Sequence, residues 1–285
     1  MRMDQQDESS NVEDVRNSSG FQFRPAHGIG LGTIAVALIA GWIFGINPLQ
    51  ILGLLSGVES SVPSTPTAPA TAPPADDAQA KFVSQILRST EVVWDHAFQE
   101  MGRTYEYPKL RVFRDAYPTG CGLGEQAAGP FYCPNDRYIY LDLSFFDLMT
   151  QQLGAPGQFA HAYVIAHEVG HHVQNLLGIL DTRQGNRRGA SGQSVRTELQ
   201  ADCFAGVWAN RSQQERGWRL EPGDIETGLN AASQIGDDTL QRRSSGTVVP
   251  ESFTHGTSAQ RVSWFKRGFE SGRIESCDTV AANTL

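Results

Sequence analysis

Apolar residues recur at helical spacing through most of the chain after residue 78. The pattern predicts a first helix from Ala78 to Gly102, where glycine ends it. Short runs of β-branched and aromatic residues follow, and they predict three strands, at 109–113, near 120–128 and at 138–143. Helical spacing then returns, at 144–154, 162–177, 194–210, 222–241 and 258–271. Strands followed by helices indicate an α+β domain, with a small mixed β-sheet followed by packed helices.

The helix predicted at 162–177 carries the run His167-Glu168-Val169-Gly170-His171. Residues four apart lie on one face of a helix, so His167 and His171 can offer imidazole nitrogens to one metal ion. Glu168 lies one step around the helix, where it would act as the general base beside a zinc-bound water. A helix with two solvated histidines is the alternative, but the apolar flanks of the motif are typical of a buried helix.

Residues typical of turns and caps mark the ends of this helix and of the helix before it. The run 154–157 breaks the chain ahead of the motif, and Pro156 suits a first-turn position of the next helix. Gly178 suits a left-handed cap at the end of that helix. Ser144 and Asp147 have the spacing of a capping box, which would start the preceding helix.

A catalytic zinc site usually has three protein ligands, so the two histidines need a third. Glu198 opens a helical stretch, 198–206, in which Glu198 and Asp202 share one face. Glu198 would bind the metal, and Asp202 would hydrogen-bond the far nitrogen of a ligand histidine and fix the orientation of its ring. The alternative is a solvated pair of carboxylates on a surface helix, which the preceding HExxH motif disfavours.

At these motifs the chain resembles the bacterial putative neutral zinc metallopeptidase family. The resemblance spans nearly the whole chain, at 11–14, 129–134, 140–146, 162–174, 198–206 and 252–258. It implies a gluzincin-type site of His167, His171 and Glu198 with one Zn²⁺ per chain, and it implies little about the substrate. In gluzincins the strand nearest the site presents a free edge to an extended peptide, a role that falls here within 120–132. Alternatively, Pro130 and the prolines around it only blunt a sheet edge.

The segment 254–261 resembles the Thr-His-Pro...Arg element of CaaX-endopeptidase-type gluzincins, with Gly256 in place of the proline. The resemblance implies that His255 donates a hydrogen bond to the oxyanion of the reaction, although the replaced proline leaves the backbone path open. Arg261, on the following helix, could pair with Glu198 or Asp202 and hold the ligand helix. The alternatives are a helix-start residue for His255 and a surface charge for Arg261.

Other histidines and tyrosines near the motif carry weaker signals. His172 lies about 100° around the helix from His171 and cannot share its metal. We expect His172, His161 and His96 to be structural. A tyrosine could assist the oxyanion, but spacing alone selects neither Tyr132 nor Tyr163.

The four cysteines show no CxxC spacing, which favours disulfides over a metal site. Cys121 and Cys133 bracket the expected substrate strand, and closing so short a loop would stabilise the fold by about 2–3 kcal/mol. Cys203 and Cys277 are then paired by elimination, which would staple the carboxyl end to the ligand helix. An even number of cysteines suits an oxidising compartment.

Residues 28–46 contain no charge and are long enough to cross a hydrocarbon layer of about 30 Å as a helix. We expect a transmembrane helix there, between a polar leader at 1–27 and a Pro/Ala/Ser/Thr-rich linker at 47–80 that tethers a zinc metallopeptidase domain at 81–285. A cleaved signal peptide is the rival, disfavoured by the long leader. The positive-inside signal is weak, so we infer the orientation from the cysteines, which suit an oxidising compartment. We expect the amino terminus in the cytoplasm and the catalytic domain outside a bacterial cell membrane.

Composition argues against one class of partner. The formal net charge is −8 and no nucleic-acid-binding motif is found, so we expect no nucleic acid to bind. The motifs together predict a membrane-anchored, zinc-dependent endopeptidase that hydrolyses peptide or protein substrates. The rivals are a zinc-stabilised, non-catalytic peptide-binding or scaffolding protein on a protease fold, and a metal-independent structural membrane protein. Cleavage specificity and oligomeric state do not follow from these residues.

Overall fold

The computed structural model describes residues 1–3, 7–17, 70–125, 129–180, 188–214, 218–282 and 285. Within this part of the chain, residues Met1–Asn17 and Ala70–Leu285 fold as one compact unit. The expected transmembrane segment, 28–46, lies outside the described residues. Among the helices of the described ranges, none combines the length and apolar character needed to cross a membrane.

Four strands form the main sheet, in the order β2-β3-β7-β6. Their bounds are Val12–Asp14 (β2), Lys109–Phe113 (β3), Phe131–Cys133 (β6) and Tyr138–Asp142 (β7). β3 runs parallel to both of its neighbours, whereas β6 is antiparallel to β7. The sheet is therefore mixed, as expected, and within the described ranges its two edges are β2 and β6.

The membership of this sheet differs from the expectation at 120–128. There, β4 (Ala116–Thr119) and β5 (Gly122–Glu125) pair with each other as a separate antiparallel hairpin. Gly122 begins β5 with a φ of 114°, a conformation that glycine adopts without steric cost. The short strand β6 occupies the sheet position instead.

The amino-terminal residues also contribute strands to the compact unit. Val12 of β2 pairs with Leu110 of β3, and β1 (Arg2–Met3) pairs antiparallel with β8 (Trp218–Arg219). Residues expected to belong to a separate leader are thus paired with the body of the fold.

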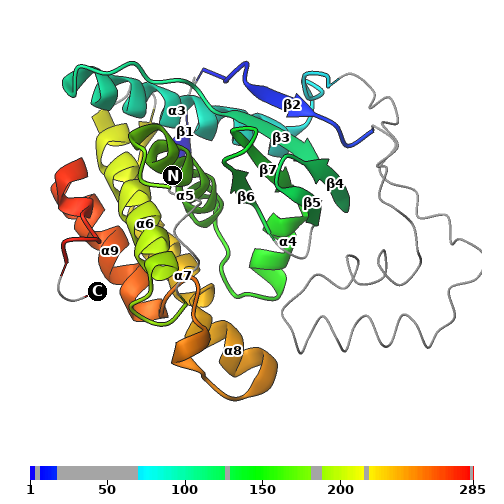
Figure 1. Cartoon of the computed structure of the whole chain (residues 1–285). Coiled ribbons are helices and arrows are strands. Elements are labelled where there is room, and N and C mark those ends of the chain that lie inside the picture. The colour runs from blue at the N-terminus through cyan, green and yellow to red at the C-terminus, as the bar shows by residue number, and fades with distance from the viewer. Residues whose placement is uncertain (4–6, 18–69, 126–128, 181–187, 215–217, 283–284) are drawn as a thin grey trace, which may run out of the picture. The chain divides into compact units, whose positions relative to one another are not determined.

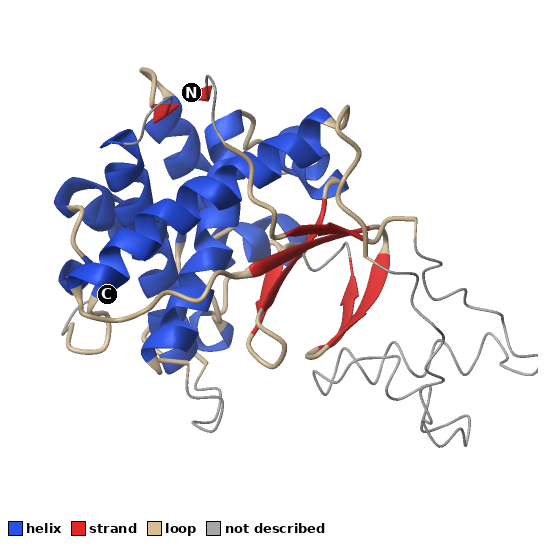
Figure 2. Ribbon diagram, turned by 90° about the horizontal axis from the view of Figure 1, so that it is seen from above, coloured by secondary structure: helices blue, strands red, loops and turns tan. Residues whose placement is uncertain are grey.

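Seven α-helices and three short 3₁₀ helices make up the rest of the described chain, and Figures 1 and 2 show the long helices packed beside the sheet. The α-helices are α3 Ala78–Glu100, α4 Ser144–Gln151, α5 Gln158–Leu177, α6 Gln193–Arg211, α7 Asp224–Gln234, α8 Asp237–Ser245 and α9 Ser258–Ser271. The 3₁₀ helices are η2 Ser212–Gln214, η3 Pro250–Ser252 and η4 Ile274–Cys277. The predicted α+β class, with a small mixed sheet and packed helices, is confirmed.

Three local expectations about the helices are wrong. The helix expected at 222–241 is two helices. They are interrupted at Gly236, where the chain passes so close to Ser258 that an added Cβ would lie 2.4 Å from the backbone nitrogen of Ser258. Helix α4 has no side-chain cap from Ser144; the carboxylate of Asp142 instead accepts hydrogen bonds from the backbone and hydroxyl of Ser144. Pro156 lies ahead of α5, whose N-cap is Gly157.

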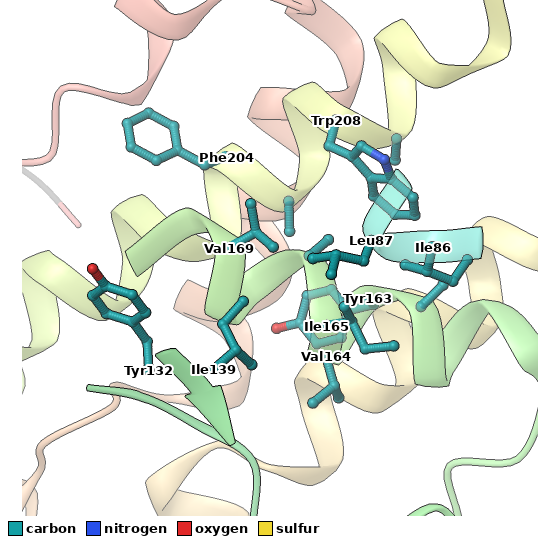
Figure 3. Packing of buried hydrophobic residues seen from close by; sticks show 14 of the residues in the cluster. Ile86, Leu87, Tyr132, Ile139, Tyr163, Val164, Ile165, Val169, Phe204 and Trp208 are labelled. Carbon is teal, nitrogen blue, oxygen red and sulfur yellow. The ribbon is translucent and has the colours of Figure 1, made fainter. Parts of the chain in front are cut away.

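Helix α5 runs through the core, and Figure 3 shows its apolar side chains among those of its neighbours. Ile165 and Val169 are almost fully buried, as are Phe204 and Trp208 of α6. The indole nitrogen of Trp208 donates to Ser89 of α3 at 3.0 Å, so this deeply buried polar atom keeps a partner. Burial on this scale is the main stabilising contribution to the position of α5.

Small residues let three helices approach closely around the HExxH motif. A side chain at Gly170 of α5 would lie 3.0 Å from the backbone oxygen of Ala201 in α6. On the other side of α6, a side chain at Gly268 of α9 would lie 1.9 Å from the backbone oxygen of Cys203. A larger residue at Gly170 would push α6 away from α5, and one at Gly268 would push α9 away from α6.

Candidate metal and catalytic site

Three side chains from α5 and α6 converge as candidate metal ligands. His167 and His171 project from one face of α5, and Glu198 faces them from α6. Nε2 of His167 lies 3.1 Å from Oε2 of Glu198, and Nε2 of His171 lies 3.4 Å from Oε1 of the same carboxylate. One donor atom from each residue lies within 4.8 Å of the other two.

This donor set fits a zinc ion. Nitrogen and oxygen ligands at about 2.0–2.2 Å in a tetrahedral arrangement lie roughly 3.4 Å from one another, close to the spacings between these atoms. Two imidazoles and one carboxylate are also a donor set that catalytic zinc sites use, with the fourth position left for water or substrate. The side chains of His167, His171 and Glu198 are 8, 13 and 19% exposed, and they line a cavity.

Asp202 fixes His167 from the side opposite the cavity. Its Oδ1 lies 2.9 Å from Nδ1 of His167, one helical turn beyond Glu198. Arg261 of α9 donates two hydrogen bonds to the same carboxylate, both at 2.9 Å, and Tyr163 donates its hydroxyl. Burial alone would raise the pKa of Asp202, but the charges of Arg261 and His167 outweigh it and hold the pKa at about 2. Of the two partners expected for Arg261, the structure selects Asp202.

Gln174 has the corresponding position beside His171. Its Oε1 lies 2.9 Å from Nδ1 of His171, so that histidine also has an oxygen partner on the nitrogen that faces away from Glu198. The amide of Gln174 is itself held, because its nitrogen donates to the backbone oxygen of Thr197 and to Gln200. We missed Gln174 from the sequence, although its spacing of three residues from His171 on one helix is the available signal.

Glu168 projects into the cavity beside the candidate ligands. The cavity has a volume of about 460 Å³ and is lined by Glu168, by the three candidate ligands and by His255. Burial raises the pKa of Glu168, and the positive charges that protonated His167 and His171 would carry oppose that rise. The backbone N–H of Tyr132 in β6 donates to the Glu168 carboxylate and orients it. A buried carboxylate with a raised pKa is suited to take and return a proton.

His255 lies at the rim of the cavity, in the loop before α9. Asp237 holds it by accepting hydrogen bonds from the backbone nitrogens of Thr254, His255 and Gly256 at 2.7, 2.6 and 3.0 Å. A second oxygen of Asp237 lies 3.2 Å from Nδ1 of His255, which raises the pKa of the imidazole and favours its hydrogen-bond-donating form. The side chain of His255 is 50% exposed.

The backbone at Gly256 explains the departure from the Thr-His-Pro pattern. Gly256 has a φ of 91°, which the ring of proline cannot adopt. The next residue, Thr257, caps α9 and forms a capping box with Gln260, so His255 is not itself the helix-start residue. We missed Asp237 from the sequence, because its contact with His255 forms only when the start of α8 meets the loop before α9.

The strand β6 contributes to the wall of the cavity. It is an edge of the main sheet, and Phe131 and Tyr132 line the cavity together with Gly129 and Pro130. The disulfide between Cys121 and Cys133 anchors the end of β6 to the neighbouring hairpin. The second disulfide joins Cys203 of α6 to Cys277, so both expected pairings are confirmed.

The phenol of Tyr132 is held by two side chains of α5. His172 donates from Nε2 to the backbone oxygen of Glu106 at 2.7 Å, which leaves its Nδ1 to accept from the Tyr132 hydroxyl at 3.1 Å. Asn175 donates to the same hydroxyl at 2.8 Å. Burial lowers the pKa of His172 to about 4, so the ring stays neutral and keeps its accepting nitrogen. His172 therefore ties β6 to the helix that carries Glu168.

Tyr132→Phe is expected to lower the free energy of unfolding by about 1–3 kcal/mol, because it removes the partner of a buried nitrogen of His172 and of the partly buried amide of Asn175. Urea denaturation of the folded protein measures this loss. Tyr117→Phe is the matched control, since Tyr117 is as buried as Tyr132 and its hydroxyl makes no hydrogen bond to other described residues. Equal losses in the two variants would contradict the role given to the phenol of Tyr132.

His161 and His96 lie apart from the candidate ligands. His161 stacks on Phe146 with ring centroids 4.3 Å apart, and burial lowers its pKa. His96 is exposed on α3. Neither lines the cavity that contains Glu168.

Comparison with known proteins identifies the family. The sequence matches the family described as putative neutral zinc metallopeptidase over residues 1–280. It is 50% identical over 292 residues to "Uncharacterized protein YpfJ" of Escherichia coli strain K12, covering 98% of each chain. It is 44% identical over 214 residues to "Uncharacterized protein Rv2575" of Mycobacterium tuberculosis strain H37Rv, covering 72% of this chain and 73% of the other. No solved structure matches the chain. The chain therefore belongs to the putative neutral zinc metallopeptidase family, as the resemblance of its motifs predicted.

Proposed function

We propose that the protein is a zinc-dependent endopeptidase of the gluzincin type. The observation that carries the proposal is the convergence of His167, His171 and Glu198 beside the buried carboxylate of Glu168, in a cavity open to solvent. A site that only stabilised the fold would use its ligands to close the metal off and would have no use for a free carboxylate beside it. This argument favours catalysis over the non-catalytic binding protein.

The reaction divides among the residues as follows. Zinc held by the two histidines and Glu198 would polarise the scissile carbonyl and acidify water. The backbone N–H of Tyr132 holds the carboxylate of Glu168 in position. Glu168 accepts a proton from the attacking water and passes it to the leaving amine. His255, oriented by Asp237, donates a hydrogen bond to the oxyanion of the tetrahedral intermediate. Asp202 and Gln174 keep the two imidazoles in orientation.

The cavity walls suit an extended peptide with an apolar side chain near the scissile bond. The edge of β6 offers main-chain hydrogen-bonding groups to a peptide laid beside it. The cavity lining also includes the apolar side chains of Phe145, Leu148, Val164 and Leu240. Main-chain pairing would tolerate many sequences, while the apolar part of the lining favours a bulky apolar residue.

We also propose that the protein is attached to a bacterial membrane through residues 28–46 and that its catalytic domain lies outside the cytoplasm. The uncharged sequence of that segment supports attachment. The pairing of all four cysteines in two disulfides supports an oxidising compartment for the domain.

Metal analysis of the full chain in detergent tests the proposed chemistry. We expect one zinc per chain, cleavage of an unstructured protein substrate, loss of both after treatment with a chelator, and recovery of both on adding Zn²⁺. Folded protein without stoichiometric zinc would reject the proposal. Stoichiometric zinc without cleavage of a broad peptide library would favour the non-catalytic binding protein instead.

A further inference from the structure

The chain leaves and re-enters the compact unit at one place. Asp14, shortly before residue 18, forms an isolated antiparallel bridge with Thr71, shortly after residue 69. The backbone nitrogen of Asp14 donates to the oxygen of Thr71 at 2.7 Å, and the reverse bond measures 3.3 Å. The guanidinium of Arg16 reinforces this junction, because it binds Asp14 at 2.6 Å and Asp77, the N-cap of α3, at 2.7 Å.

The amino-terminal strand β2 and the residues beside it pack into the core of the fold. Val12 and Val15 are 5% and 4% exposed, and each packs within a cluster of buried residues. The pairing with β3 continues beyond both ends of β2. The backbone nitrogen of Leu110 donates to the oxygen of Asn11, and that of Val15 donates to the oxygen of Val112, both at 2.9 Å.

Buried polar groups also depend on this segment. Glu91 of α3 is 2% exposed, and its Oε1 accepts hydrogen bonds from Ser9 and Asn11. The carboxylate of Glu13 in β2 accepts from Arg111 of β3, which is itself mostly buried. Removal of residues 7–17 would leave Glu91 and Arg111 with unsatisfied groups, which is costly in a folded protein.

We propose that residues 1–17 and the catalytic domain lie on the same side of the membrane to which the protein is attached. A single crossing would separate residues 17 and 70 by a hydrocarbon layer of about 30 Å. Hydrogen bonds between Asp14 and Thr71 are incompatible with that separation. This topology replaces the arrangement expected from the sequence, in which the amino terminus stays in the cytoplasm.

The sequence between residues 17 and 70 contains the uncharged stretch that the proposed membrane attachment needs. Uncharged residues continue beyond residue 46 as far as Val58. Charged residues flank the whole stretch, with Arg24 before it and Glu59 after it.

The junction lies at the sheet edge opposite the catalytic site. β2 and β6 are the two edges of the main sheet, separated by three strand spacings, or roughly 14 Å. Asp14, one side of the junction, is the last residue of β2, whereas Glu168 accepts a hydrogen bond from the backbone of Tyr132 in β6. The substrate edge proposed for β6 is therefore roughly 14 Å from the junction of Asp14 and Thr71.

Labelling of engineered cysteines tests the topology in the full chain. The native cysteines are all in disulfides, so single variants Ser10→Cys and Ser263→Cys each add one reactive thiol. Both serines are exposed, the first before β2 and the second on α9. The probe is a membrane-impermeant maleimide, applied without reductant to sealed right-side-out and inverted vesicles from expressing cells, with detergent-opened vesicles as the control for full reactivity.

We expect the two variants to react in the same vesicle orientation, at least about tenfold faster than in the other, and to stay with the membrane after washing with alkaline carbonate. Reaction of Ser10→Cys and Ser263→Cys in opposite orientations would overturn the shared side. Release of the chain by carbonate would overturn attachment through this segment. The inference rests on the proposed membrane attachment but not on peptidase activity, so its failure would leave the proposed chemistry untouched.

Discussion

Glu168→Gln is expected to lower kcat for peptide cleavage by about 10³-fold or more while the zinc content stays at one per chain. General-base catalysis by a positioned side chain contributes about 10²–10⁴-fold, and here the same group also returns the proton to the leaving amine. Glutamine has nearly the same shape and still offers an oxygen to the backbone N–H of Tyr132. Only the capacity to accept a proton is lost.

The zinc measurement separates this effect from damage to the site. Glu168 is not among the three convergent donors, so its replacement removes no candidate ligand. Glu226→Gln is the matched control, because Glu226 is exposed on α7 and distant in sequence from the motif. Retention of wild-type cleavage by Glu168→Gln, measured with the same substrate, would exclude Glu168 as the base.

The parts of the fold that local periodicity controls were predictable from the sequence. Helix α3 begins at Ala78 as expected, and α5 ends at Gly178, whose φ of 75° makes it the left-handed cap. The HExxH motif was readable for the same reason, since the spacing of His167 and His171 on a helix fixes their geometry.

Elements that depend on distant contacts were not predictable in this way. Residues 12–14 are too short and too polar to show a strand pattern, and β2 exists because β3 lies beside it. The break between α7 and α8 at Gly236 arises from the approach of Ser258, more than twenty residues further along the chain. Asp237 likewise reaches His255 only through that approach, so no local signal pointed to it.

The candidate site lies between these two cases. Glu198 and Asp202 were chosen because they share a helix face, and the structure brings that face to the histidines through close packing at Gly170 and Ala201. Arg261 was less certain from the sequence, because its partner depended on how α9 packs against α6. The close approach at Gly268 brings the guanidinium to Asp202, and Arg261 also lines the cavity.

Asp202→Ala is expected to lower the free energy of unfolding by about 3–5 kcal/mol, because removing one partner of a buried ion pair leaves the other charge uncompensated. Arg261 is 2% exposed and donates to both oxygens of Asp202. No other carboxylate within the described residues forms an ion pair with Arg261. Urea denaturation of the chelator-treated protein measures the loss without a contribution from bound metal.

The same substitution should weaken zinc binding by about 10–100-fold, since an oxygen partner on the far nitrogen of a ligand histidine fixes the ring for the metal. In Asp202→Ala the ring of His167 loses this partner at Nδ1. Competition with a chelator of known affinity measures the change in Kd. Zinc affinity equal to that of the wild type would show that Asp202 serves stability alone.

The double variant Asp202→Ala/Arg261→Met separates the two effects. Replacing a buried ion pair by apolar groups is often close to neutral, so the double variant should recover at least half of the stability lost in Asp202→Ala. His167 would still lack its oxygen partner, so zinc affinity should remain low in the double variant. If stability and affinity recovered together, Arg261 rather than Asp202 would set the metal site. If neither recovered, the loss in Asp202→Ala would come from the hydrogen bonds to His167 and Tyr163 and not from an unpaired guanidinium.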